Sequence, residues 1–272
     1  MHRRILQHFT LLAAALTLAS FATAQDAAPK RIVIDAETDA ATTTCQASFS
    51  SGIGWLETQL CVTVNGNISK FALSGQALLN QNAAVDYEGY GFCDVATVTP
   101  YLDYGVWNNN LNASKFTQSG NTITVTRTST DGNWQLTQTI VNTNATASAT
   151  GYVTMNMKLK NLTTTARQVN FVRAANVDIS VVTANDFNTT ALTATGQWPW
   201  GQGLMLSSHS QINHGFVSAL IQNVNYGPPP CNPYENYQSP LPFTGDGSIM
   251  LLWNVTIKAN ASQTFTAVYR GL

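Results

Sequence analysis

Few side chains in this sequence are able to do acid–base chemistry. Glu88 and Asp94 lie in one Gly- and Tyr-rich segment, and either carboxylate could act as a general acid or base. His209 and His214 lie five residues apart and could approach each other on a turn. None of the four belongs to a recognised catalytic motif. We therefore expect Glu88 to brace its segment through backbone N–H groups and the histidines to be neutral turn residues, with catalysis as the alternative.

Asp178 and Asp186 are the candidates for metal binding. Asn176, Asn185 and Asn188 lie near them in the sequence, and oxygen ligands of this kind suit Ca²⁺. The spacing matches no EF-hand loop, and Asp and Asn are also ordinary turn-forming residues. A structural calcium ion is thus the less favoured interpretation, and no other cofactor is predicted.

Aromatic side chains in irregular segments are the most suggestive remaining feature. In Trp198-Pro199-Trp200 the two indoles flank a proline, whose fixed φ keeps the chain extended. Tyr234 and Tyr237 follow a Pro-rich stretch, and Trp107 ends another aromatic segment. Exposed rings can stack against sugar faces while Asn, Gln and Asp bind the hydroxyl groups. Core packing is the other role of such rings, and both interpretations stay open for the two indoles.

The first 24 residues have the layout of a secretory signal peptide. Arg3 and Arg4 precede an uncharged run at 10–21, and residues 22–24 supply an A-x-A cleavage site. The apolar run is too short to span a bilayer. We expect the mature protein to begin near Gln25 and to be secreted, periplasmic or on the cell surface.

Four cysteines lie in the mature part of the chain, where an oxidising compartment and an even count favour disulfides. We favour Cys45–Cys61, which would close a local loop between strands, and Cys93–Cys231, which would join two distant loops. No CxxC spacing occurs, so zinc binding and a redox role are both disfavoured.

Alternating hydrophobicity predicts strands through most of the mature chain. Residues 152–160 alternate strictly between apolar and polar side chains, as in a strand with one buried face. Asn65-Gly66 and Asp131-Gly132 are typical hairpin turns. Two regions, 80–112 and 225–247, break the rhythm and are predicted to be irregular loops. No helical periodicity is present, so we predict an antiparallel β-sandwich.

Several strings carry a resemblance to known proteins. EGYGFCD at 88–94, VRAANVD at 172–178, PCNP at 230–233 and GDGS at 245–248 resemble a group of uncharacterised exported bacterial β-sandwich proteins. The strand at 152–161, followed by an Arg-x-x-x-x-Val-Asp strand, is similar to galactose-mutarotase-like supersandwich domains, some of which are attached to carbohydrate-active enzymes. The resemblance implies a large sandwich. In the mutarotase-like enzymes His and Glu residues in a concave sheet do the chemistry, but no such motif matches here residue by residue.

The composition excludes some partners. Only 10% of the residues are charged, and without Arg3 and Arg4 the 11 basic residues face 14 acidic ones, a net charge of −3. Nucleic acid needs clustered Lys and Arg, so it is not an expected partner. No further segment is long and apolar enough for membrane insertion.

The preferred hypothesis is a secreted sandwich over 45–272, preceded by a flexible arm at 25–44, that binds a glycan or polysaccharide through aromatic residues at its loop ends. The alternatives are a lyase- or epimerase-like enzyme and a structural cell-surface protein that associates with copies of itself.

Overall fold

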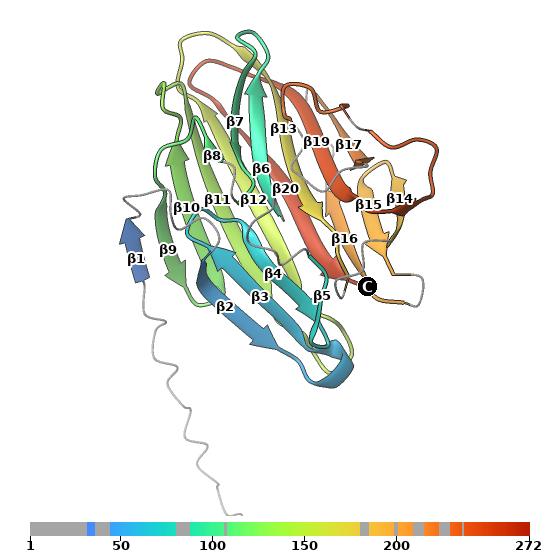
Figure 1. Ribbon diagram of the computed structural model, residues 1–272. Helices are drawn as coiled ribbons and strands as arrows, with labels where there is room; N and C mark the ends of the chain where they lie inside the picture. Colours follow the sequence, from blue (N-terminus) through green and yellow to red (C-terminus); the bar gives the residue numbers. More distant parts are fainter. Residues whose placement is uncertain are drawn as a thin grey trace, which may run out of the picture.

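The computed structural model shows a nearly all-β protein built from three antiparallel sheets (Figure 1). The structure describes residues 32–35, 44–79, 88–105, 108–179, 185–198, 201–208, 215–222, 229–235 and 237–272. Figure 1 shows the two smaller sheets lying in front of the long strands of the largest sheet. The predicted fold class, an antiparallel all-β sandwich with disulfide-linked loops, is confirmed.

The largest sheet has ten strands. Its clearest member is β12, in which Val153, Met155, Met157 and Leu159 are all buried and the residues between them face outward. This confirms the strand predicted from strict alternation. In spatial order the sheet contains β1 (Ile32–Asp35), β9 (Lys115–Ser119), β10 (Thr122–Thr128), β11 (Trp134–Thr143), β12 (Tyr152–Asn161), β20 (Ser262–Gly271), β16 (Gly203–Ser208), β15 (Thr193–Gln197), β14 (Asn185–Thr190) and β18 (Phe243–Gly245).

Strand β1 comes from the segment that the sequence assigned to a flexible arm. Its residues, Ile32–Asp35, pair with β9 at the edge of the ten-stranded sheet. This part of the predicted arm is therefore a strand.

The six-stranded sheet corrects one prediction. Region 80–112, expected to be an irregular loop, contributes three of its strands, and all seven residues of β6 are buried. A strand covered on both faces shows no alternation, which is why its sequence did not read as a strand. In spatial order the sheet contains β17 (Gly215–Gln222), β19 (Ser248–Ile257), β13 (Arg167–Asn176), β6 (Glu88–Asp94), β7 (Thr99–Asp103) and β8 (Asn108–Asn109).

Glycine explains the close packing around β6. A Cβ atom on Gly89 would lie 2.0 Å from the carbonyl oxygen of Asp103 and 2.7 Å from Cα of Tyr104. Any larger residue would push the neighbouring chain away. The glycines that suggested a loop are thus needed for close contact between chain segments.

The four-stranded sheet is formed by four strands that follow one another near the start of the described chain. Its β3–β4 hairpin turns at Asn65-Gly66, as predicted, with Gly66 at a φ of 86°. The sheet contains β2 (Cys45–Ser51), β3 (Thr58–Thr63), β4 (Ile68–Leu73) and β5 (Gln76–Ala77), and the short 3-10 helix η2 (Gly54–Leu56) connects β2 to β3.

One hydrophobic core joins the three sheets. Phe92 and Phe171 of the six-stranded sheet stack at 6.2 Å between ring centroids, and Phe171 stacks on Phe265 of the ten-stranded sheet at 4.5 Å. Trp134 and Trp253 are fully buried against these rings. The four-stranded sheet adds its inward side chains to the same cluster, among them Leu60, Val62, Phe71 and Leu73.

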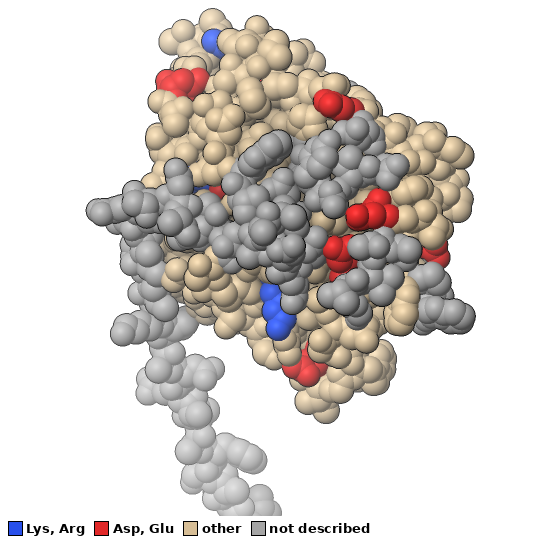
Figure 2. Space-filling model, in the orientation of Figure 1, with Lys and Arg blue, Asp and Glu red and all other residues tan. Residues whose placement is uncertain are grey.

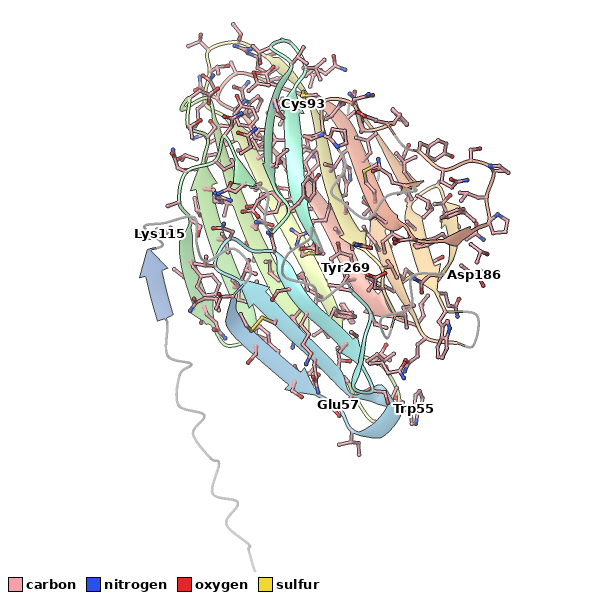
Figure 3. All side chains as sticks on the ribbon, viewed as in Figure 1. Trp55, Glu57, Cys93, Lys115, Asp186 and Tyr269 are labelled. Atoms are coloured by element: carbon pink, nitrogen blue, oxygen red, sulfur yellow. A yellow bond between two sulfur atoms is a disulfide. The ribbon has the colours of Figure 1, made fainter. Side chains whose placement is uncertain are left out.

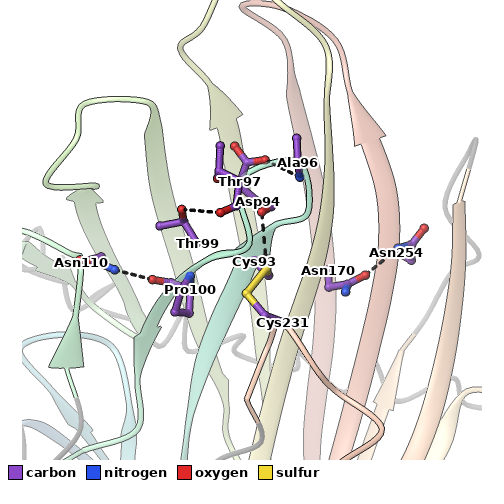
Figure 4. The surroundings of a disulfide bond; sticks show 10 residues. All are labelled: Cys93, Asp94, Ala96, Thr97, Thr99, Pro100, Asn110, Asn170, Cys231 and Asn254. Atoms are coloured by element: carbon purple, nitrogen blue, oxygen red, sulfur yellow. Dashed lines mark hydrogen bonds between the residues drawn. A yellow bond between two sulfur atoms is a disulfide. The ribbon is translucent and has the colours of Figure 1, made fainter.

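Both predicted disulfides are confirmed. Cys45 is bonded to Cys61 within the four-stranded sheet. Cys93 on β6 is bonded to Cys231, 138 residues later in the sequence (Figure 4). Among the described residues, no helix has the length and apolar character needed to cross a bilayer.

Candidate functional site

The acid–base candidate Glu88 lies in the protein interior. Its carboxylate forms an ion pair with Arg173, and both side chains are fully buried. It also accepts hydrogen bonds from the backbone N–H of Ile68 at 2.7 Å and from the Tyr269 hydroxyl at 2.9 Å. Burial raises the pKa of Glu88, while Arg173 and these two donors act to lower it. The backbone N–H that donates to Glu88 belongs to Ile68 on β4 and not to its own segment, so the Glu88 carboxylate links β6 to β4, β13 and β20.

A second buried ion pair lies beside the first. Arg127 donates to Asp103, and the side-chain amides of Asn65 and Asn67 also donate to this carboxylate. The carbonyl oxygen of Gly66 in the same turn accepts a hydrogen bond from Arg173 at 3.2 Å. The β3–β4 turn therefore contacts both ion pairs, the second through its two asparagines and the first through Gly66. We call this set of interior polar contacts the turn network. It fixes the turn of the four-stranded sheet between the other two sheets.

Asp94 also forms an ion pair. Its carboxylate accepts a hydrogen bond from Arg167 at 3.1 Å, and only 1% of the Asp94 side chain is exposed. It also accepts from the backbone N–H of Ala96 (Figure 4). In the described part of the chain, neither Glu88 nor Asp94 presents its carboxylate to solvent.

The other predicted site residues are placed in different ways. His209, His214, Trp107 and Trp200 lie outside the described residues. Trp198 is half-buried and packs against the hydrophobic core.

Tyr234 and Tyr237 are exposed, at 51% and 43%. The structure thus leaves these two tyrosines at the surface, in the loop that also contains Cys231.

The two metal candidates have separate surroundings. Asp178 lies beside Asp246, and burial together with the Asp246 charge raises the pKa of Asp178 to about 6. Asp186 accepts a hydrogen bond from the Thr244 hydroxyl at 2.6 Å. Within the described ranges no three His, Cys, Asp or Glu side chains are grouped closely enough to hold a metal ion. Calcium binding remains a prediction.

A different surface combines exposed aromatic and polar groups. The outer face of the four-stranded sheet has a depression of about 540 Å³, within the size range of ligand pockets. The depression is lined by Cys45, Ser48, Phe49, Ser50, Gln59, Leu60, Cys61, Ser69 and Lys70. The loop that joins the β2 and β3 residues of this lining contains Trp55, which is 74% exposed and is labelled with Glu57 in Figure 3. We call this depression together with Trp55 the open-sheet site.

The β2–β3 loop is held in a defined shape. Gly52 and Gly54 have positive φ values of 83° and 60°, which glycine adopts without strain. A Cβ on Gly52 would lie 2.8 Å from Cβ of Ala145, so the loop packs tightly there. Leu56 is buried and anchors the loop. Trp55 therefore extends from a fixed support.

Hydrogen bonds organise the polar side of the site. Lys70 donates to the Gln59 side-chain oxygen at 2.7 Å, and the Gln59 amide donates to Glu57 at 2.8 Å. These contacts form a row along the sheet, from the depression toward the loop. The hydroxyl groups of Ser48 and Ser50 lie in the same depression and are exposed. Such a face offers ring stacking, neutral hydrogen bonding and one cation.

Trp55 was not found from the sequence. The signal available was its position between Gly52-Ile53-Gly54 and the strand that follows, because glycines on both sides of Ile53 favour a projecting loop. Ile53 itself is 84% exposed. Figure 2 shows that charged side chains are few and scattered on the visible face, as the composition predicts.

Comparisons with known proteins show likeness of fold only. No protein-family model and no curated protein matches the sequence. A bacterial glucoamylase complexed with acarbose is similar with a TM-score of 0.52 and 10% identity, covering 89% of this chain and 36% of the enzyme. A mutant of heparan sulfate lyase HepC from Pedobacter heparinus is similar with a TM-score of 0.47 and 13% identity, covering 82% of this chain and 34% of the lyase.

A putative aldose 1-epimerase from Escherichia coli K12 gives a TM-score of 0.45 and 9% identity, covering 83% of this chain and 99% of the other. The chain thus spans about a third of the length of the glucoamylase and of the lyase. At this level of identity, what this chain shares with the glucoamylase is its fold.

Proposed function

We propose that the protein binds a polysaccharide at the open-sheet site. The observation that carries the proposal is the exposure of Trp55, 74%, beside a polar depression. Leaving an indole in water forgoes the stabilisation that burial of a large apolar side chain provides, about 1.5–3 kcal/mol. A rigid loop that keeps this ring exposed therefore favours a role in recognition.

The chemistry around the ring suits a sugar. A pyranose has an apolar C–H face that can stack on an indole, and its hydroxyl groups require neutral donors and acceptors. Gln59, Ser48 and Ser50 supply such groups in the depression. The similarity of fold to a glucoamylase crystallised with acarbose supports a carbohydrate-related role.

Catalysis receives no comparable support from the described residues. Glu88 and Asp94, the acid–base candidates, are both held in ion pairs with arginine. A general acid or base must come within hydrogen-bonding reach of its substrate. We therefore prefer binding to a lyase- or epimerase-like reaction.

The test is a glycan array followed by calorimetric titration with any polysaccharide that binds. Trp55→Ala should weaken binding about five- to a hundredfold, because stacking on one ring is worth about 1–3 kcal/mol. Its melting temperature should stay within a few degrees of the wild type, since the ring contributes little to the core. Ile53→Ala is the matched control on the same loop and should bind normally.

A second variant separates this site from the tyrosine surface predicted from the sequence. Tyr234→Ala removes an exposed ring from the other loop. Loss of binding in Tyr234→Ala with normal binding in Trp55→Ala would transfer the function to the tyrosine surface. Absence of binding to every glycan would contradict the proposal for both surfaces.

A further inference from the structure

We infer that the open-sheet site selects an acidic polysaccharide, one whose sugars carry carboxylate groups. This inference rests on the proposed function and adds the class of ligand. The observation behind it is that Lys70 is the only charged residue among the described residues that line the depression. The described part of its wall thus has a cation and no anion.

Among the described residues, none forms an ion pair with Lys70. In the described part of the chain, no carboxylate lies within ion-pair distance of its ammonium group, and the three ion pairs found there all involve arginine. Lys70 is half-buried, so its charge is less screened than that of a fully exposed lysine. A carboxylate placed in the depression would supply the missing counter-charge.

The ammonium group also has free donors. An ammonium group has three N–H bonds, and one of them is used in the hydrogen bond to Gln59. The described residues offer no further acceptor to the other two, which could bind a ligand. The exposed hydroxyl groups of Ser48 and Ser50 lie in the same depression, and each can donate a further hydrogen bond to an anionic oxygen.

Glu57 gives the site a direction. It lies on the far side of Gln59 from Lys70, because the Gln59 oxygen accepts from Lys70 and the Gln59 amide donates to Glu57. The carboxylate of Glu57 therefore lies at the end nearer Trp55 and would repel an anion there. A bound chain would place an acidic sugar over Lys70 and stack a sugar face on Trp55.

The experiment compares acidic polysaccharides with their neutral counterparts. Polygalacturonate, alginate and hyaluronan fragments are titrated into the protein alongside the same fragments after reduction of the carboxylates to primary alcohols. At low salt, we expect the acidic member of a pair to bind about tenfold more tightly, because hydrogen bonds to a charged group are the strong ones. Raising the salt to about 0.5 M should reduce this difference.

Three variants assign the effect to the charge. Lys70→Gln should lower affinity for the acidic fragment about tenfold and leave affinity for the reduced fragment within about twofold. Lys70→Arg retains the cation and should keep the preference. Glu57→Gln removes the opposing carboxylate and should strengthen binding of the acidic fragment.

The outcomes separate the two proposals. If reduced fragments or neutral glucans bind as tightly as acidic ones, in a manner that depends on Trp55, the inference is overturned and the proposed function stands. An unchanged preference in Lys70→Gln, with a normal melting temperature, also overturns it. If no fragment binds, acidic or neutral, the proposed function fails and the inference fails with it.

Discussion

Removing Arg173, one of the two cations of the turn network, should be severely destabilising. Arg173 is fully buried and donates to Glu88, to the Gln138 side-chain oxygen at 2.8 Å and to the carbonyl oxygen of Gly66 at 3.2 Å. In Arg173→Met the carboxylate remains in the interior without its counter-charge, and the other two acceptors lose this donor. Breaking a buried pair from one side costs about 3–5 kcal/mol, a large part of a typical unfolding free energy of about 5–15 kcal/mol.

The loss should depend on pH in a defined direction. Burial raises the pKa of Glu88, and removing Arg173 removes the largest interaction that opposes this rise. A carboxyl group whose pKa is higher in the folded state gives stability at low pH that is lost as the pH rises through that pKa. Arg173→Met should therefore be less destabilised at pH 5 than at pH 8.

A double variant provides the control. Adding Glu88→Gln to Arg173→Met makes the site neutral. The amide oxygen of the glutamine can accept from the backbone N–H of Ile68, and its NH2 group can donate to the hydroxyl oxygen of Tyr269; in the wild type both groups donate to Glu88. The double variant should recover about 2 kcal/mol or more at pH 8 and remove the part of the pH dependence that comes from Glu88. Urea unfolding at both pH values, with equal m-values, measures these differences. An Arg173→Met variant that loses less than about 1 kcal/mol, or a double variant less stable than the single one, would refute this reasoning.

Two further predictions concern stability. Replacing Cys93 and Cys231 with alanine should lower the free energy of unfolding by about 5 kcal/mol in the chain-entropy relation, because the bond joins residues 138 apart. Urea unfolding measures the loss, and a loss no larger than that from removing Cys45–Cys61, whose residues are 16 apart, would contradict the prediction. Asp178, whose pKa is raised to about 6 by burial and by Asp246, gives stability that is lost as the pH rises from about 4 to 7. Asp178→Asn should be more stable than the wild type at pH 8 by about 1 kcal/mol, after allowance for partial exposure. An advantage of the variant that is no larger at pH 8 than at pH 4 would contradict the assignment.

Strands were predicted most accurately where one face of the strand is exposed to solvent and the other is buried. In β12, polar side chains separate Val153, Met155, Met157 and Leu159, and the burial of the strand follows this period of two. The disulfides could also be predicted, because four cysteines leave only three possible sets of pairings. The turn at Asn65-Gly66 was recognised from its dipeptide alone.

The sequence was least informative where tertiary contacts determine the role of a residue. Glu88 and Gly89 suggested an irregular loop, but the charge is paired with Arg173 and the glycine lies against Asp103 and Tyr104. Arg173 is 85 residues away from Glu88 in the sequence, so no local pattern predicts this ion pair.

The tryptophans show the same limit at the surface. Trp198 in its Gly- and Pro-rich segment packs against the core, whereas Trp55 in another glycine-containing segment is exposed. The difference comes from what each loop packs on. Leu56 anchors one loop and leaves its neighbour Trp55 outside.

The turn network also has a consequence for the order in which the chain can fold. The Tyr269 hydroxyl that binds Glu88 is 181 residues later in the sequence, so at about 5–20 residues per second it is synthesised roughly 10–40 s after Glu88. During this interval the buried carboxylate lacks one of its donors, and its cation, Arg173, is 85 residues away. Contacts of such long range make folding slow. A nascent chain would therefore complete this part of its interior only after β20 has been synthesised.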